Sequence, residues 1–442
     1  MAYQKNSFQA WIICITASLF FCFHFTEATV MDALSAQLMQ TFQLTAASLA
    51  NLSASYFYGN LICLIPAGII LDRFSTKKVV CLMFSLLILG SVFFCFSGGF
   101  YTAFISRFIE GVGGTFAFLC CLRLASTWFT SDKLPLALGI IITIAFIGGI
   151  LSHEPIIMLT NSFGWRGALF ILSFIGLIAL LLNYLFLRDN PSDIPDEKQI
   201  RLTFTQLTIQ LKKVLTNPYT WIGALYTTFL NLPVLVLGAL WSTIYLHQVH
   251  SFSIDQASII ASLTFFGLII GTPIAGYYAK NEQRIAVLLL LGSFLSTLLL
   301  YLLIFYPGNS FFFLSLIFFA LGLFSSTQSV GYSIVLTNSK TDIISLASSI
   351  ISIFVMAGGT IIKILFGIIL DHAWPGHITQ SAVRSFSAMN FKFALLFLSV
   401  FFIASILLAF YYRFKIMQKT VHPQNAIDIK NSDRKKFEPE EA

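Results

Sequence analysis

Long apolar runs alternate with short polar segments over nearly the whole chain. A helix needs about 20 apolar residues to cross the hydrocarbon core of a bilayer, whereas strands of a membrane β-barrel alternate apolar and polar residues. The pattern predicts an all-α polytopic membrane protein with twelve transmembrane helices. Their approximate bounds are 9–33, 45–72, 77–98, 100–128, 134–158, 163–187, 218–246, 253–279, 284–306, 309–336, 341–370 and 386–412.

Composition supports a membrane protein. The 442 residues are 57% hydrophobic and 10% charged, whereas soluble domains carry about 25% charged residues. The net charge of +7 needs no nucleic acid to explain it, because most basic residues fall on one side when both termini are placed in the cytoplasm. Positive residues favour the cytoplasmic side of a membrane. We therefore expect a bacterial inner (plasma) membrane protein in contact with the lipid bilayer.

The longest internal polar segment divides the twelve runs into six and six. Two six-helix bundles joined by a cytoplasmic linker indicate an internal duplication, which is typical of transporters. Within the linker, apolar residues recur at helical spacing and predict a short amphipathic helix: Phe204, Leu207, Leu211 and Leu215. The expected units are an N-terminal bundle, a linker, a C-terminal bundle and a disordered cytoplasmic tail, at 1–187, 188–217, 218–412 and 413–442.

The stretch PAGIILDRFSTKK, residues 66–78, ends the second apolar run abruptly in charged residues. Gly68 and Asp72 are four apart and share a helix face, where a glycine lets a neighbouring helix approach closely. A carboxylate at such a helix end can lie against the positive N-terminus of that neighbour. Basic residues after the turn can hold the next helix at the headgroups. We expect a conformational latch between the two halves, formed by Gly68, Asp72, Arg73, Lys77 and Lys78; the alternative is that these charges only fix topology.

Three segments carry a resemblance to a known family. The stretch from Gly68 to Lys78 resembles the loop 2–3 signature of the major facilitator superfamily, although Ser75 stands where glycine is usual and Thr76 where a base is usual. Residues 107–114, RFIEGVGG, resemble the R-x-x-x-G-x-G motif, and residues 164–166, GWR, open helix 6 as in the family. The resemblance implies the major facilitator fold and a secondary carrier, of the amino-acid- and dipeptide-carrying bacterial type.

The resemblance also implies a partner for the latch. In the family the neighbour of this loop is helix 11, which here starts near Thr341. Asp342 lies at the same helix start and would repel Asp72.

Charged residues inside the apolar runs are costly, so a functional role is the first hypothesis. We expect Glu27 and Arg107 to pair or to share a substrate, with Glu27 as the proton carrier; the alternative is a structural ion pair. His24 lies on the same helix face as Glu27. Glu110 is an alternative partner for Arg107. Lys363 is expected either to hold a substrate carboxylate or to extend its ammonium group to the membrane surface.

Uncharged polar residues add weaker candidates for the transport cavity. Tyr56 lies in the second run, Asn231 in the seventh and Gln328 in the tenth. Pro233 follows Asn231 closely and predicts a helix break that frees backbone groups.

Several motifs are absent from the sequence. Without a P-loop, a cluster of metal ligands or a nucleophile triad, we expect no ATPase, no cofactor, no metal and no enzyme activity. The antiporter pattern G-x-x-x-G-P-x-x-G-G is missing from the fifth run, which disfavours drug–proton antiport.

These observations predict a monomeric secondary transporter of a small polar organic solute, such as an amino acid, a short peptide or an organic anion. Transport is expected to proceed by alternating access with proton coupling. One alternative is multidrug efflux by proton antiport, in a cavity rich in the 47 phenylalanines. Another is a membrane receptor or scaffold, which would carry an appended soluble domain that we do not find in this sequence.

Overall fold

The computed structural model describes residues 5–130, 133–190, 204–338, 344–374 and 385–421. Within these ranges all regular secondary structure is helical. The first half of the chain forms α1 (Phe8–Thr29), α2 (Met31–Phe42), α3 (Ala46–Arg73), α4 (Thr76–Cys95), α5 (Phe100–Gly114), α6 (Phe116–Trp128), α7 (Leu134–Leu151) and α8 (Glu154–Phe186). The second half begins with α9 (Phe204–Thr216), α10 (Pro218–Leu230), the π-helix η1 (Pro233–Trp241), α11 (Ser242–His250) and α12 (Ile254–Tyr278). It continues with α13 (Glu282–Phe305), α14 (Phe311–Ser325), the 3₁₀ turn η2 (Ser326–Ser329), α15 (Val330–Asn338), α16 (Ile344–His372) and α17 (Ala388–Val421).

Polar residues start many of these helices. A Ser, Thr or Asn side chain accepts a backbone N–H of the first turn, which satisfies a donor that the helix itself leaves unpaired. Such caps occur at Ser7, Thr45, Asn217, Ser253, Asn281 and Ser310. Short polar segments therefore divide the apolar sequence into separate helices.

Ten stretches of the described residues are long and apolar enough to cross a membrane. One of them, Leu136–Phe186, contains most of α7 and all of α8, which are separated at Ser152 and His153. α3 is 28 residues long and is not among the ten. Counting α7 and α8 as two crossings and adding α3 gives twelve. The all-helical membrane fold is thus confirmed, while the exact number of crossings stays a prediction.

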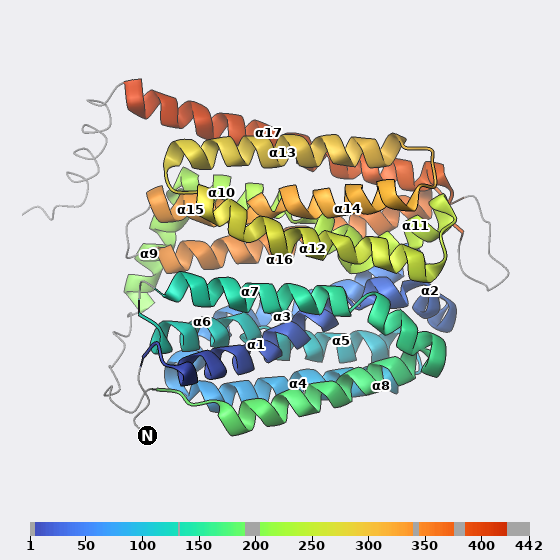
Figure 1. Ribbon diagram of the computed structural model, residues 1–442, viewed down its shortest axis with the longest axis horizontal. Coiled ribbons are helices and arrows are strands. Elements are labelled where there is room, and N and C mark those ends of the chain that lie inside the picture. Colours follow the sequence, from blue (N-terminus) through green and yellow to red (C-terminus); the bar gives the residue numbers. More distant parts are fainter. Residues whose placement is uncertain (1–4, 131–132, 191–203, 339–343, 375–384, 422–442) are drawn as a thin grey trace, which may run out of the picture.

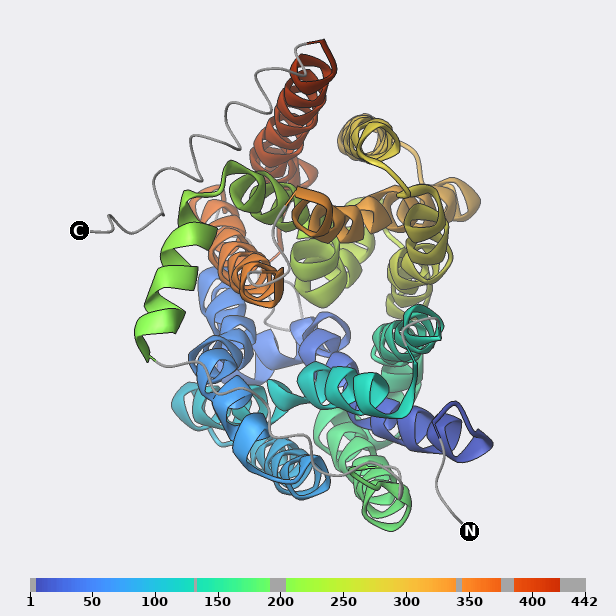
Figure 2. The same ribbon diagram turned by 90° about the vertical axis from the view of Figure 1, so that its left-hand side faces the viewer.

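The two halves of the chain lie side by side. Figures 1 and 2 show α1–α8 on one side of the molecule and α10–α17 on the other, with most helices running along a common direction. α1 begins and α17 ends at the same end of the bundle, which we call the terminal side. α2 and α11 lie at the opposite end, which we call the far side.

The linker contains α9, at the position where the sequence predicts an amphipathic helix. Val214 is buried, whereas Ile209, Leu211 and Leu215 are exposed. An exposed apolar face beside basic residues is typical of a helix on a membrane surface. At the other end of the chain, α17 continues to Val421, past the predicted boundary at 412. The domain boundaries themselves stay predictions.

Glycines bring α3 and α5 into backbone contact. A Cβ atom on Gly111 would lie 1.8 Å from the carbonyl oxygen of Tyr56. A Cβ atom on Gly59 would lie 2.2 Å from the carbonyl oxygen of Phe108. Only a residue without a side chain permits this approach. The two glycines therefore hold the backbones of α3 and α5 together.

The second half repeats this arrangement between α12 and α14. A Cβ atom on Gly322 would lie 1.9 Å from the carbonyl oxygen of Thr264, and one on Gly267 would lie 2.2 Å from that of Phe319. On every one of the four helices, the glycine and the contacted carbonyl are three positions apart. The same packing unit thus occurs once in each half, as an internal duplication would leave it.

We expect Gly111→Ala to destabilise the protein severely. The added methyl group would overlap the backbone of α3, and overpacking of this kind costs about 1–3 kcal/mol or more. Gly139→Ala in α7 is the control, because its Cβ would meet no atom within 4 Å and alanine favours a helix. Thermal unfolding, monitored by size-exclusion chromatography of heated samples, should show a much lower unfolding temperature for Gly111→Ala and an unchanged one for Gly139→Ala. Equal unfolding temperatures of the two variants would contradict the packing argument.

Candidate functional site

Three charged side chains meet inside the first half, fully buried: Glu27 on α1 and Arg107 and Glu110 on α5. Nη1 of Arg107 lies 3.5 Å from Oε2 of Glu27 and also contacts Oε2 of Glu110. Nη2 of Arg107 donates to the backbone oxygen of Glu27 at 2.8 Å. The structure thus brings together the pair that the sequence singles out, and it adds Glu110 to that pair. We call these three residues the carboxylate cluster.

Serines connect the cluster to two further helices. Ser91 on α4 donates to Oε1 of Glu27 at 2.8 Å, and Ser173 on α8 donates to Ser91 at 3.0 Å. Four helices therefore position the carboxylate of Glu27.

The charges of the cluster do not balance. Two carboxylates share one guanidinium group, so one negative charge is in excess when both are ionised. Oε2 of Glu27, Oε1 of Glu110 and Nε of Arg107 are buried without a hydrogen-bond partner among the described residues. A buried charge in excess is energetically unfavourable. The cluster can relieve this cost by taking up one proton.

Tyr56 and His24 border the cluster. The guanidinium carbon of Arg107 lies 4.7 Å from the centre of the Tyr56 ring, which is a cation–π contact. The hydroxyl group of Tyr56 is 2.7 Å from Nδ1 of His24. Both side chains are buried. Two more of the candidate residues therefore belong to the same site.

Lys363 on α16 reaches across to the first half. Its side chain is fully buried, and Nζ donates to Ser53 on α3 at 3.1 Å. Nζ also lies 4.4 Å from the centre of the Phe57 ring. No carboxylate in the described part of the chain lies within 4.0 Å of this ammonium group. Of the two expectations for Lys363, a lysine that extends to the membrane surface does not match this position.

Arg107 and Lys363 are linked through α3. Tyr56 and Phe57 are consecutive residues, and each ring lies under one of the two cations. Two buried cations are thus held by neighbouring positions of one helix.

The other two uncharged candidates, Asn231 and Gln328, lie elsewhere. Asn231 is half-buried at the end of α10, directly before the π-helix, so the predicted break near Pro233 is present. Gln328 is half-buried in η2, where its backbone oxygen accepts from Thr227 at 3.0 Å. In the described structure no hydrogen bond joins either side chain to the carboxylate cluster or to Lys363. Asn231 and Gln328 thus belong to the second half and not to the site around Glu27.

Comparison with known proteins decides the family. The sequence profile of the Major Facilitator Superfamily matches residues 16–280. The chain belongs to this superfamily. Membership confirms the family resemblance and the class of fold, and it makes the chain an integral membrane protein.

Individual relatives of this major facilitator chain are distant. A probable sulfoacetate transporter from Cupriavidus necator is 22% identical over 54% of the chain and 58% of its own length. A hexuronate transporter from Bacillus subtilis is 25% identical over 55% of the chain and 59% of its own length. The chain therefore spans less than three fifths of these curated relatives.

A solved structure shows the same fold over most of the chain. The crystal structure of a bacterial homolog of the human lysosomal transporter Spinster, described as inward-facing and unoccupied, has a TM-score of 0.74 and 14% identity. The match covers 93% of this chain and 98% of that one.

The expected latch of this superfamily member is only partly described. A Cβ atom on Gly68 would meet no described atom within 4 Å. The side chain of Asp72, and both Thr341 and Asp342, lie outside the described residues. Arg73 and Lys78 are exposed. The latch stays a proposal.

An unexpected acid occupies the start of α4. Asp189, just after α8, accepts from the backbone N–H of Lys77 at 2.7 Å and from the hydroxyl group of Ser75. The ammonium group of Lys77 lies 5.2 Å from the centre of the Tyr184 ring. A carboxylate at a helix N-terminus is favourable. Hydrogen bonds therefore connect the loop after α3 to the end of α8, within the first half.

The two halves are held together by polar contacts toward the far side. Asp371 on α16 accepts from the backbone N–H groups of Ala46 and Ala47 at 2.9 and 2.7 Å, which caps the start of α3. Asp32 on α2 accepts from the backbone and the hydroxyl group of Thr243 on α11. Each contact joins residues more than 200 positions apart, so no local sequence pattern could predict the pairing. For Asp32, the sequence shows only that an acid lies at the end of the first apolar run.

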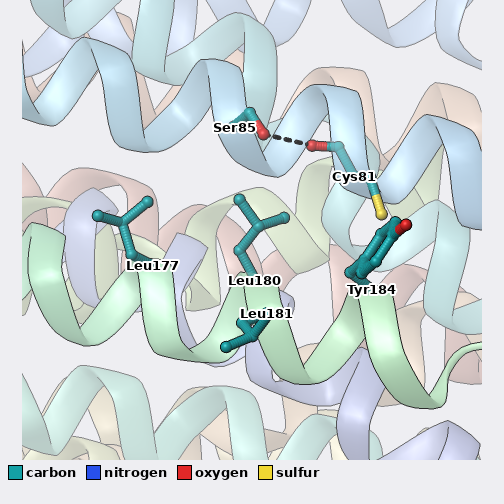
Figure 3. Close-up of a pocket in the computed structure, with 6 residues that line it drawn as sticks. All are labelled: Cys81, Ser85, Leu177, Leu180, Leu181 and Tyr184. Atoms are coloured by element: carbon teal, nitrogen blue, oxygen red, sulfur yellow. Dashed lines mark hydrogen bonds between the residues drawn. The ribbon is translucent and has the colours of Figure 1, made fainter.

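A hollow of about 290 Å³ lies between α4 and α8 (Figure 3). It is lined by Cys81, Ser85, Leu177, Leu180, Leu181 and Tyr184. Leu177, Leu181 and Tyr184 are exposed, and α4 lies within a candidate membrane span, as α8 does. This apolar hollow is suited to contact with lipid and not to recognition of a polar solute.

Proposed function

We propose that the chain is a secondary active transporter that moves a small organic anion across the membrane by alternating access, coupled to protons. Membership of the superfamily supports transport, and it supports the prediction that the chain is not an enzyme. Two relatives are named for sulfoacetate and hexuronate, and both of these solutes are organic anions.

The buried ammonium group of Lys363 carries the proposal for the substrate class. A fully buried cation is stable only when it is paired or solvated, yet its described partners are one hydroxyl group and one aromatic ring. An anionic substrate would supply the missing negative charge. In contrast, Arg107 already contacts two carboxylates. Lys363 is therefore the cation that is available to a carboxylate or sulfonate group.

The same arrangement disfavours the other substrate classes. A zwitterionic amino acid or dipeptide needs a carboxylate for its ammonium group, and in this proposal Arg107 and a proton together neutralise the two carboxylates of the cluster. A lipophilic cation, as in multidrug efflux, would be repelled by Lys363. An organic anion matches the described charges best.

The carboxylate cluster is the proposed proton site, with Glu27 as the proton carrier. Glu110 makes the closer contact with Arg107 and is the better paired of the two carboxylates. Oε2 of Glu27 is 3.5 Å from the guanidinium group and has no hydrogen-bond partner among the described residues. The proton is therefore expected on Glu27.

Contacts between the halves support the alternating-access part of the proposal. Asp32, Lys363 and Asp371 join the halves toward the far side, while a Cβ atom on Gly68, near the terminal end of α3, would meet no described atom within 4 Å. We infer a conformation that is open toward the terminal side. With both termini placed in the cytoplasm of a bacterial inner membrane, this conformation faces inward. One chain holds both halves, so a monomer is the proposed unit.

Uptake into proteoliposomes tests this function. We expect labelled hexuronate or sulfoacetate to accumulate when the pH outside is lower than inside, and not after a protonophore removes the gradient. Dipeptides and lipophilic cations serve as the competing classes. Accumulation of either one without any organic acid would overturn the proposed substrate class.

A further inference from the structure

A histidine lies beside the contact that closes the far side. His153 stands between α7 and α8 and is fully buried. Its Nε2 atom is 3.4 Å from Oδ2 of Asp32, which is also fully buried. Asp32 in turn accepts from Thr243 of the other half, through the backbone N–H at 3.1 Å and the hydroxyl group at 2.6 Å. A titratable pair therefore sits within a contact between the halves.

One ring nitrogen of His153, Nδ1, faces hydrogen-bond acceptors. Nδ1 is 2.8 Å from the carbonyl oxygen of Gly149, which can only accept. Nδ1 is also 3.0 Å from the hydroxyl oxygen of Ser152, which itself donates to Gly149 at 2.8 Å. Nδ1 must therefore carry a proton. Nε2 lies within ion-pair distance of the Asp32 carboxylate but makes no hydrogen bond among the described residues, so a neutral ring would leave the charge of Asp32 without a cation.

The carboxylate of Asp32 is suited to its ionised form. The hydroxyl group and the backbone N–H of Thr243 both donate to it, and an ionised carboxylate offers only acceptors. The additional proton of the pair therefore belongs on the imidazole ring. His153 is then an imidazolium cation whose charge neutralises Asp32.

We propose that His153 and Asp32 form a second proton-binding site, separate from the carboxylate cluster, which must hold one proton for the halves to close on the far side. Without that proton, closure would bury the charge of Asp32 beside a neutral ring. With it, Asp32 is neutralised while it holds Thr243. The proposal depends on alternating access but not on the identity of the substrate.

Other groups near the pair do not replace this proton. The ring of Phe265 on α12 packs 5.4 Å from His153 and carries no charge. Glu154 is the next residue in the chain, and Asp255 on α12 is near enough to Glu154 to interact with it electrostatically. Both are acids and supply no cation for Asp32. Among the described residues, no lysine or arginine lies within 4.0 Å of the Asp32 carboxylate.

Nitrogen-15 spectroscopy of histidine tests the charge state directly. Of the seven histidines, the signals that disappear in His153→Gln belong to His153. We expect both of its ring nitrogens to be protonated in the closed wild-type protein at neutral pH. A ring with one unprotonated nitrogen would overturn the proposal. This readout is independent of transport, so it can fail while the proposed function stands.

Spin-label distances test the link to closure. Labels at Gln40 and Asn309, exposed on the two halves, are placed on a background in which the seven cysteines are replaced. We expect the closed population to fall at least twofold between about pH 5 and 9, where histidine charge changes most often occur. A population that does not change with pH would overturn the proposal.

Two variants separate the pair from other titrating groups. In Asp32→Asn, the amide can donate to Nε2 of a neutral ring and still accept from Thr243, so closure should no longer depend on pH. In His153→Gln, the side-chain amide can donate to Asp32 and cannot titrate, so the pH dependence should again be lost. Glu27→Gln should keep it. A pH dependence that persists in both variants at the pair would overturn the proposal.

Discussion

Lys363→Met should remove high-affinity binding of the organic anion. Methionine keeps most of the length of the side chain and removes the charge. Truncating one partner of a buried charge pair costs about 2–5 kcal/mol, so the dissociation constant of the substrate should rise about 30-fold or more. Titration of detergent-purified protein with hexuronate or sulfoacetate, followed by calorimetry, measures the change.

The same variant should not unfold more readily. The ammonium group is buried without a described carboxylate, and a hydrophobic residue in place of such a charge is neutral or stabilising. Loss of binding with an unchanged or higher unfolding temperature would distinguish a substrate contact from a structural one. Lys392→Met is the matched control, because Lys392 also lies over a ring, 4.6 Å from the centre of Phe305. Equal losses of affinity in the two variants would contradict the role of Lys363.

Glu27→Gln should uncouple transport from the proton gradient. With one proton per anion, a gradient of one pH unit supports about tenfold accumulation, because a factor of ten corresponds to about 1.4 kcal/mol. Glutamine cannot bind and release a proton, so the variant should only equilibrate the substrate. Counterflow exchange, which needs no net proton movement, should remain within about twofold of the wild type. Parallel accumulation and exchange measurements in proteoliposomes check both results.

Glu110→Gln tests why Glu27 would bind a proton. Removing this second carboxylate leaves one carboxylate for Arg107, so the excess negative charge disappears and coupling should again be lost. If Glu27 acted without Glu110, Glu110→Gln would remain coupled. Asp255→Asn changes an exposed acid on α12 and should accumulate substrate as the wild type does. Undiminished accumulation by Glu27→Gln would remove Glu27 as the proton carrier.

The helices could be predicted closely because hydrophobicity is a local signal. The apolar run predicted at 284–306 became α13, Glu282–Phe305, and the polar residue Asn281 caps it. The charged residues of the site could also be selected, since a charge within an apolar run is costly and rarely accidental. The pairing of Glu27 with Arg107 could be predicted because the two residues lie at similar depths in their apolar runs.

Contacts between the halves could not be predicted. Lys363 and Ser53 are 310 positions apart, and Asp32 and Thr243 are 211 apart. Only the packed arrangement of the halves brings such residues together, and it depends on the conformation of the carrier. Asp189 was not predicted either, because it lies in a polar linker where an acid has no unusual energetic cost.

The carboxylate of Asp371 holds two backbone N–H groups at the start of α3, a helix of the other half. When the halves separate on the far side, these groups lose their partner, while Thr45 continues to hold the N–H of Ser48. The first turn of α3 should then fray, since helix ends unwind when their donors are not capped. Amide hydrogen exchange at Ala46 and Ala47 would therefore report how often the carrier opens, without any label and without knowledge of its substrate.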